Sequence, residues 1–213
     1  MDNHRYWEDK LADYTQEQWV KRPSIFATQS VSYFPSQGSI LELAGGQGQD
    51  SEWFASQGFH VTYSDFVDKV VQQVRERTSG VQNITCTTAD LSKELPFSPE
   101  RFDVVYSHMG LHYFDRRETR RILTNIHGIV QSRGTIALLL NTVDDPEIRE
   151  HEYKQIEEHT YEDPRSGLQK SYFSVEYLLG LSRGLFKPLL LDHQGRTYKD
   201  DVKTLVRFVG EKE

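Results

Sequence analysis

The sequence predicts an α/β fold in which a mostly parallel, doubly wound sheet of seven strands ends in an antiparallel C-terminal hairpin. Five short apolar runs alternate with longer amphipathic segments along residues 39–140, and this alternation is typical of βαβ units. Two further apolar runs near the C-terminus are separated by about eight residues, whereas a parallel connection needs roughly a dozen. The last two strands should therefore be antiparallel neighbours.

The segment before the first apolar run predicts helices that are extra to the sheet. Tyr6–Tyr14 and Pro23–Phe34 both have helical character, and Pro23 would occupy the first helical position, where its missing N–H leaves no hydrogen bond unmade. The first five strands should be buried on both faces, because they are short and rich in β-branched or aromatic residues. The seven strands are expected at Ser39–Ala44, His60–Ser64, Ile84–Thr88, Phe102–Ser107, Thr135–Leu140, Leu189–His193 and Val202–Val209.

The clearest helix follows the fourth strand. Arg116–Val130 carries its isoleucines on one face at helical spacing, with Asp115 as the N-cap, Glu118 three residues later and a break at Gly134. After the fifth strand, Asp144–Asp163 is strongly acidic and weakly periodic, which indicates a solvated helix and loop. A last short helix should then be capped by Ser174, run through Ser182 and end near Gly184.

Composition narrows the classes of function. The chain has 213 residues, a net charge of −7 and a single cysteine, and its basic residues are spread rather than clustered. An acidic chain without a basic patch is a poor candidate for binding nucleic acid, and one cysteine allows no disulfide framework. The N-terminus lacks the pattern of an export signal, and no apolar stretch is long enough to span a membrane. We therefore expect one soluble, cytoplasmic domain that acts on a small molecule.

A glycine-rich turn follows the first strand. In "SILELAGGQGQDSEWFASQGFHVTYSDF" the glycines at 45, 46 and 48 remove the Cβ atoms that would keep a ligand at a distance, and Asp65 closes the next strand. Such a turn suits a phosphate or a nucleoside, and an acid at the end of the second strand can accept from two ribose hydroxyls. The dinucleotide motif G-x-G-x-x-G would need a glycine at Ser51, so a nicotinamide-dependent oxidoreductase loses support.

The same stretch, together with "TTADLSKELPF" and "FDVVYSHMGLHYF", resembles the class I S-adenosylmethionine-dependent methyltransferases, which have a Rossmann-like fold. The resemblance implies a small-molecule methyltransferase with S-adenosyl-L-methionine as cofactor. It implies cap helices at 1–37, a cofactor-binding half at 38–142, and a substrate-side segment with the hairpin at 143–213. Ala44 departs from the family, which has the first glycine of the motif there. The cofactor-binding residues that the resemblance implies are Glu42, Ala44, Gly45, Gly46, Gly48, Asp65, Phe66, Asp90, Leu91 and Ser107.

Each of these positions also has a purely structural interpretation. Glycines after a strand can form a tight turn alone, and Asp65 or Asp90 could cap a helix or a loop. Glu42 could serve only to order the loop, since a buried carboxylate needs a partner. What favours the ligand interpretation is that all of them follow successive strands and would face one crevice.

Two histidines in "SHMGLHYF" are the candidate catalytic residues. His108 or His112 could take the proton that some acceptors lose on methylation, or could simply line the pocket. Tyr106 and Tyr113 could face the sulfonium or belong to the core. No metal site is expected, although His151, Glu152, Glu158 and His159 carry the right side chains.

Three functions remain open at this point. The first is methylation of O, N or S on a small-molecule acceptor by a monomer or homodimer, with no nucleic acid or membrane as partner. The second is a non-catalytic protein that binds the adenosyl cofactor and regulates a partner. The third is an NAD-dependent oxidoreductase.

The N-terminal helices, which carry Trp7, Tyr14 and Trp19, would either close over the site as a lid or pack on the sheet.

Overall fold

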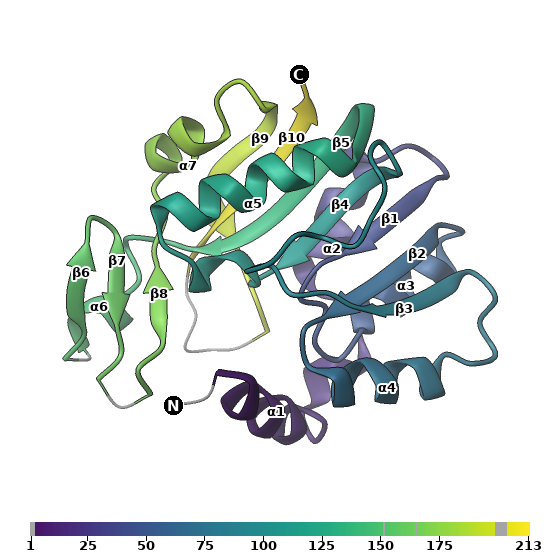
Figure 1. The fold of residues 1–213 in the computed structure, drawn as a ribbon, viewed down its shortest axis with the longest axis horizontal. Helices are drawn as coiled ribbons and strands as arrows, with labels where there is room; N and C mark the ends of the chain where they lie inside the picture. Colours follow the sequence, from purple (N-terminus) through teal and green to yellow (C-terminus); the bar gives the residue numbers. More distant parts are fainter. Residues whose placement is uncertain (1–2, 151, 165, 199–203) are drawn as a thin grey trace.

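The computed structural model describes residues 3–150, 152–164, 166–198 and 204–213 (Figure 1). Its main sheet has seven strands in the order β3-β2-β1-β4-β5-β10-β9. β1 to β5 form the parallel part, and β10 is antiparallel to both β5 and β9. The predicted fold class is confirmed. The strands are β1 (Ser39–Glu42), β2 (His60–Asp65), β3 (Ile84–Thr88), β4 (Phe102–His108), β5 (Val130–Asn141), β9 (Phe186–Gly195) and β10 (Leu205–Lys212).

The terminal hairpin is longer than the sequence predicted. β9 and β10 extend beyond the expected Leu189–His193 and Val202–Val209 at nearly every end, and residues 202 and 203 lie outside the described part of the chain. β5 likewise begins at Val130, directly after the helix that precedes it, rather than at Thr135. The extra residues are partly polar, so hydrophobicity alone did not predict that they would pair.

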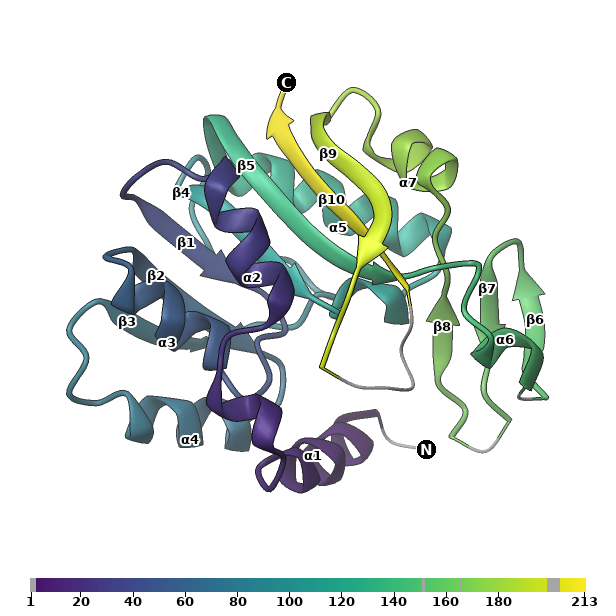
Figure 2. The same cartoon turned by 180° about the vertical axis from the view of Figure 1, so that it is seen from behind.

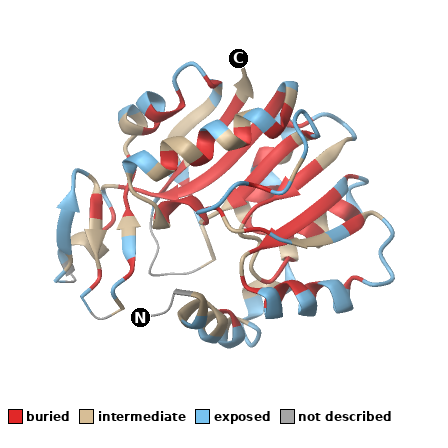
Figure 3. Cartoon of the chain, in the orientation of Figure 1, coloured by how far each residue is buried: buried red, intermediate tan, exposed pale blue. Residues whose placement is uncertain are grey.

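Helices cover both faces of the main sheet (Figures 1 and 2). α5 (Arg116–Ile129) and α7 (Val175–Ser182) pack on one face, and α2 (Ile25–Ser30) and α3 (Gln49–Ser56) pack on the other. α4 (Asp68–Arg77) packs against β2 and β3 through its valines. The strands between these layers are buried, as Figure 3 shows for the centre of the sheet.

The predicted caps of two helices are confirmed. The Asp115 carboxylate accepts from the backbone N–H of Glu118 at 2.8 Å at the start of α5. The Ser174 hydroxyl accepts from the N–H of Tyr177 at 3.1 Å at the start of α7. Both bonds satisfy an N–H group that the helix itself leaves unpaired.

The prediction for Pro23 is wrong. α2 begins at Ile25, and Ser24 is its N-cap, with the hydroxyl of Ser24 accepting from the N–H of Ala27 at 3.0 Å. The helix is also shorter than Pro23–Phe34, because it continues only as a 3₁₀ turn over Val31–Tyr33. A serine is a stronger start signal than a proline when its hydroxyl can reach the third N–H of the helix.

The acidic segment Asp144–Asp163 is also different from the prediction. It forms a single helical turn, α6 (Glu147–Glu150), followed by β6 (Lys154–Glu157) and β7 (Thr160–Glu162), which join β8 (Gln169–Ser171) in a separate antiparallel sheet. All four residues of β6 are exposed (Figure 3), so this strand shows no apolar alternation. No hydrophobic pattern predicted β6, because this edge strand buries no side chain.

Glu147 ties the small sheet to α6. Its carboxylate accepts from the ammonium of Lys170 at 2.6 Å and from the hydroxyls of Tyr153 and Tyr172. Burial by itself would raise the pKa of Glu147, but these hydrogen bonds and the Lys170 charge hold it below its ordinary value. The carboxylate therefore stays ionised and keeps the three partners together.

The strand order indicates where a ligand-binding crevice should lie. Chain connections leave β1 toward β2 and β3 on one side, whereas β4 and β5 lie on its other side. Open α/β sheets bind ligands outside the carboxyl ends of the strands where the order reverses. The crevice is therefore expected beyond Glu42 and His108, the last residues of β1 and β4.

Candidate active site

A cavity of about 680 Å³ lies at the carboxyl ends of the central strands, with α1 (Asn3–Tyr14) over it. The structure brings most of the predicted site residues to its wall. Gly48 and Ser107 do not line the cavity. Those that line it are Glu42, Ala44, Gly45, Gly46, Asp65, Phe66, Asp90, Leu91, His108 and His112.

Asp65 is bonded directly to the glycine turn. One carboxylate oxygen accepts from the N–H of Gly46 and the other accepts from the N–H of Val67, each at 3.0 Å. Burial raises the pKa of Asp65, and the backbone N–H groups oppose that rise. A carboxylate has about four acceptor positions, so two remain for a ligand in the cavity. Asp65 is not the N-cap of α4, because Val67 holds that position.

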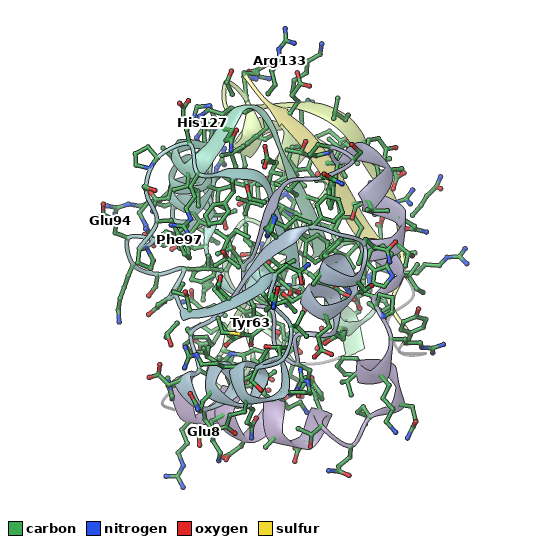
Figure 4. All side chains as sticks on the ribbon, turned by 90° about the vertical axis from the view of Figure 1, so that its right-hand side faces the viewer. Glu8, Tyr63, Glu94, Phe97, His127 and Arg133 are labelled. Carbon is green, nitrogen blue, oxygen red and sulfur yellow. The ribbon has the colours of Figure 1, made fainter. Side chains whose placement is uncertain are left out.

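The glycines have different reasons to be glycine. Gly46 has φ +51°, and a Cβ there would meet only Leu11, at 3.5 Å, so the backbone conformation and not the core excludes a side chain. A Cβ on Gly45 would lie 2.6 Å from the ring of Tyr63, which is seen inside the molecule in Figure 4. Gly48 has φ +74°, and a Cβ would lie 2.9 Å from Val74. Gly48 therefore lets α3 and α4 approach, and Gly46 leaves the cavity side of the turn open.

Two acids at the end of β1 and the start of α3 are close to each other. Glu42 accepts from the hydroxyl of Ser51, and its pKa is raised well above the ordinary value by burial first and then by the Asp50 charge. Asp50 accepts from the N–H of Ser24 at 2.6 Å and from the hydroxyls of Ser24 and Tyr106, both at 2.7 Å. These contacts join α2, α3 and β4 under the cavity.

Asp90 follows β3 in a compact turn. Its carboxylate accepts from the N–H of Ser92 at 2.9 Å and from the Ser92 hydroxyl at 2.6 Å. Burial would raise the pKa of Asp90, but these bonds and the Lys93 ammonium hold it below its usual value. Asp90 thus orders its own loop and presents an ionised carboxylate to the cavity.

Comparison with known proteins finds methyltransferases. Residues 40–134 match a family described as "Methyltransferase domain". Over this stretch the chain is similar to methyltransferase domains. The stretch contains all ten predicted cofactor residues and both candidate histidines, and the resemblance to class I S-adenosylmethionine-dependent methyltransferases is confirmed.

Curated relatives match the same part of the chain. A demethylmenaquinone methyltransferase from Clavibacter sepedonicus is 31% identical over 99 residues, which are 46% of this chain and 39% of that protein. An uncharacterized methyltransferase from Synechocystis is 24% identical over 47% of this chain and 45% of that protein. The match thus spans less than half the length of either relative.

Solved structures match nearly the whole chain. The 1,6-didemethyltoxoflavin-N1-methyltransferase of Burkholderia thailandensis has a TM-score of 0.75 at 17% identity, covering 98% of this chain and 84% of that one. The N-methyltransferase NodS of Bradyrhizobium japonicum has a TM-score of 0.70 at 18% identity and covers 99% of both chains. At these identities the likeness is one of fold.

Ala44 is the one position where the sequence departs from the pattern of the family that it resembles, and in the structure Ala44 lies close to Gly110. Ala44 has φ +53°, a left-handed conformation that is uncommon for a residue with a Cβ. Its methyl group points at Gly110, where an added Cβ would lie 2.6 Å from the Ala44 Cβ and 2.6 Å from the Ser107 hydroxyl oxygen. Ser107 in turn donates to the carbonyl of Leu43 at 2.9 Å, so its place is under the turn.

This contact predicts coupling between two positions. Gly110→Ala should lower the free energy of unfolding by about 1–3 kcal/mol, because it overpacks a fixed site. Adding Ala44→Gly should recover part of that loss, since it removes one of the two clashing groups. Urea denaturation of the two single variants and the double variant measures the coupling. Strictly additive effects would show that the methyl groups do not compete for one space.

The two candidate catalytic histidines, His108 and His112, lie in different elements and not on one face of a helix. His108 ends β4 and His112 lies in the 3₁₀ turn Leu111–Tyr113, with Met109 in a left-handed conformation between them. Burial first, and then the Lys170 and His108 charges, lower the pKa of His112 to about 3. A base of that strength takes up a proton weakly, so the cavity keeps His112 neutral and favours His108 for general-base chemistry.

A pH dependence of stability follows from His112. Below its ordinary pKa of 6.5 the unfolded chain binds a proton that the folded chain refuses until about pH 3. The free energy of unfolding should therefore fall as the pH is lowered through this window, by at most about 1.4 kcal/mol per pH unit from this group. His112→Gln should flatten the slope in urea titrations between pH 6.5 and 4. An unchanged slope would show that His112 is protonated in the folded protein.

The sequence reasoning missed several residues at the cavity. Gln49, Asp50, Ser24 and Ile25 line it, together with Met109, Leu168, Gln169 and Tyr198. In the sequence, nothing distinguishes Asp50 from other acidic residues at the start of a helix. No local pattern predicts its hydrogen bonds with Ser24. Gln169 belongs to β8 of the small sheet, where the sequence predicted no strand.

Aromatic residues of the N-terminal segment form part of the cavity wall. Trp7, Tyr14 and Trp19 line the cavity, and the ring of Trp7 contacts that of Tyr113 edge to face with centroids 4.8 Å apart. The amide of Gln47 donates to the carbonyl of Leu11 and holds α1 to the glycine turn. Tyr106, by contrast, is a core residue, fully buried and stacked on Phe26.

Two kinds of feature are absent from the described residues. No cluster of three or more His, Cys, Asp or Glu side chains there could hold a metal ion, and His151 lies outside the described residues. No helix in the described part of the chain is long and apolar enough to cross a membrane.

Proposed function

We propose that the protein binds S-adenosyl-L-methionine in the cavity and transfers its methyl group to a small-molecule acceptor. The observation that carries this proposal is the joint placement of Asp65 and the glycine turn, hydrogen-bonded to each other at one wall of the cavity. Asp65 has two acceptor positions left for the ribose hydroxyls, and Asp90 presents an ionised carboxylate for the adenine amino group.

The residues present suit this cofactor. Its sulfonium and ammonium groups are positive, and among the described residues the cavity is lined by the carboxyl groups of Asp50, Asp65 and Asp90 and by no lysine or arginine. Glu42 adds a fourth carboxyl, whose raised pKa favours its neutral form. Gly46 leaves room beside the turn, where a side chain would obstruct the methionine part. Phe66 and Leu91 offer apolar walls next to Asp65 and Asp90 for the adenine ring. Gly45, Gly48, Ala44 and Ser107 shape the turn beneath.

The cofactor supplies an activated methyl group, whose carbon forms a bond to the acceptor's O, N or S atom as its bond to sulfur breaks. The protein's part is to hold the acceptor in line with that carbon and to exclude water. An acceptor that loses a proton can pass it to His108 or to water. His112 keeps its neutral ring at the same wall and serves as a hydrogen-bonding group.

The small-molecule class of the acceptor has independent support. The relatives named above carry small-molecule acceptors in their names, demethylmenaquinone in one and 1,6-didemethyltoxoflavin in another. In this chain α1 contributes Trp7, Leu11 and Tyr14 to the cavity wall and the small sheet contributes Gln169, so the site is a concave pocket of the kind that binds small molecules. A monomer or homodimer, as the sequence suggested, would be sufficient for this chemistry.

Calorimetric titration tests the proposal. S-adenosylmethionine and S-adenosylhomocysteine should both bind with micromolar affinity, and NAD should give no heat. Binding of NAD alone would return the oxidoreductase hypothesis to first place. Binding of the adenosyl ligands without methylation of any acceptor would favour the regulatory hypothesis.

A further inference from the structure

A second hollow, of about 600 Å³, lies on the surface where the start of α5 meets the end of α7 and the end of β6 (Figure 1). Basic residues are spread along the sequence as a whole, yet four arginines gather at this hollow. Its lining includes Arg116, Arg117, Arg120, Arg183 and Glu157, none of which lines the cavity of the proposed methyl transfer.

The backbone at the end of α7 holds Arg120 in place. Its Nη1 atom donates to the carbonyl of Leu181 and, at 3.1 Å, to the carbonyl of Arg183. A guanidinium group has N–H donors on all three nitrogens, so those on Nε and Nη2 remain for a ligand. Because the side chain is already fixed, it loses little conformational entropy when an anion binds.

The charges at this hollow do not balance. The Arg116 guanidinium lies 3.9 Å from the Glu158 carboxylate, and the Glu157 carboxylate accepts from the backbone N–H of Arg116 at 2.9 Å. Within the described ranges of the chain, Arg117 and Arg183 form no ion pair. Four guanidinium groups are thus set against two carboxylates, which leaves two positive charges for an anion to neutralise.

Three of these arginines stand where α5 itself disfavours a positive charge. Arg116 and Arg117 are the first two residues of α5, next to the positive end of the helix dipole. Arg120 follows them at the spacings of three and four residues that bring like charges together on one face of a helix. The helix gains no stability from this arrangement, but an anion bound among the arginines would be attracted by all three and by the helix terminus.

The size and the donors of the hollow indicate the class of ligand. A volume of about 600 Å³ is within the range of small-molecule sites. The planar guanidinium group matches the oxygens of a phosphate group with paired N–H donors, and a phosphate monoester carries close to two negative charges at neutral pH.

From these contacts we infer that the hollow is a second binding site, which takes a small molecule through its phosphate or diphosphate group. Arg117, Arg120 and Arg183 hold the phosphate oxygens, and Arg116 adds its charge beside them. The site is separate from the proposed methyl transfer and does not depend on it.

Calorimetric titration with inorganic pyrophosphate tests the class of ligand, in buffer without divalent cations and with the ionic strength held constant by sodium chloride. The unaltered protein should bind one pyrophosphate with a Kd below about 1 mM, and succinate at least about tenfold more weakly. No saturable binding of pyrophosphate would overturn the inference, and so would equal or tighter binding of succinate. Tighter binding of a short single-stranded oligonucleotide would overturn the small-molecule assignment, because it would assign the phosphate contacts to a polymer.

Single variants test whether pyrophosphate binds at the hollow. Arg117→Gln and Arg183→Gln should each weaken its binding about tenfold, because each removes one charged donor group. Arg133→Gln is the matched control, since Arg133 is an exposed arginine of β5 outside the hollow (Figure 4), and it should leave the affinity unchanged. Unchanged affinity in both hollow variants, or the same loss in all three, would overturn the inference.

Urea denaturation without ligand separates binding from a structural role. Arg117→Gln should unfold at the same urea concentration as the unaltered protein or at a higher one, because a repelled charge has been removed from the start of α5. A lower midpoint would show that Arg117 stabilises the fold, and would overturn the argument that its charge serves a ligand.

Discussion

Asp65→Ala should weaken the binding of S-adenosylmethionine by about 10- to 100-fold, which corresponds to the loss of one or two charge-assisted hydrogen bonds. In the structure the Asp65 carboxylate faces the cavity and is held in place by the N–H groups of Gly46 and Val67. The variant therefore removes the proposed ribose contact and also releases the glycine turn. Calorimetric titration with S-adenosylmethionine and S-adenosylhomocysteine measures the effect.

Two further variants separate these contributions. Asp65→Asn keeps one acceptor oxygen and the volume of the side chain, so it should bind more tightly than Asp65→Ala. Asp68→Ala removes an exposed carboxylate three residues away, one that accepts only from the surface hydroxyl of Thr88, and should leave affinity unchanged. Thermal unfolding without ligand shows how much of the loss is stability. Wild-type affinity in Asp65→Ala would refute the ribose assignment.

Asp50→Ala should lower the free energy of unfolding by about 3–5 kcal/mol, the largest stability effect that we expect from a single site. Asp50 is 1% exposed, and its removal leaves the buried N–H of Ser24 without its acceptor, while the hydroxyls of Ser24 and Tyr106, which are 3.0 Å apart, keep only the bond in which one donates to the other. Urea denaturation monitored by tryptophan fluorescence measures the loss.

Glu52→Ala is the matched control for Asp50. Both acids lie in the first turn of α3, so both interact with the helix dipole in the same way. The Glu52 side chain, however, is 41% exposed, and among the described residues its carboxylate pairs with Arg77, so its loss should cost no more than about 0.5 kcal/mol. Similar values for the two variants would show that the buried bonds of Asp50 add nothing. If Asp50→Ala does not fold, Tyr106→Phe removes one of the bonds and should cost about 1 kcal/mol.

The sheet and the glycine turn could be predicted from the sequence because each depends on local signals. Short apolar runs, the glycines after β1 and the caps Asp115 and Ser174 act within a few residues of themselves. The small sheet could not be predicted, because its edge strand β6 is exposed and its anchor, Glu147, draws partners from residues 153, 170 and 172. Pairing between distant polar residues leaves no periodic pattern in the chain.

The same distinction applies to the candidate site. Residues that directly follow a strand were predicted, and most of them line the cavity, whereas Ser107 and Gly48 lie beneath it. The positions of Gln49 and Tyr198 at the cavity were not predicted, because they result from contact between segments that are far apart in sequence. A strand end can be located from hydrophobicity, but the far wall of a pocket depends on tertiary packing alone.

The contact between Ala44 and Gly110 also limits how this turn can change by single substitutions. A Cβ at position 110 would lie 2.6 Å from the Ala44 Cβ and 2.6 Å from the Ser107 hydroxyl oxygen. Starting from glycine at 44 and alanine at 110, a route to the present pair that loses the methyl at 110 first avoids the state with two methyl groups. The other route passes through that overpacked state, which is the Gly110→Ala variant described above. The residue at position 110 therefore affects which substitutions the glycine turn tolerates, although it lies in the connection after β4 and the turn lies after β1.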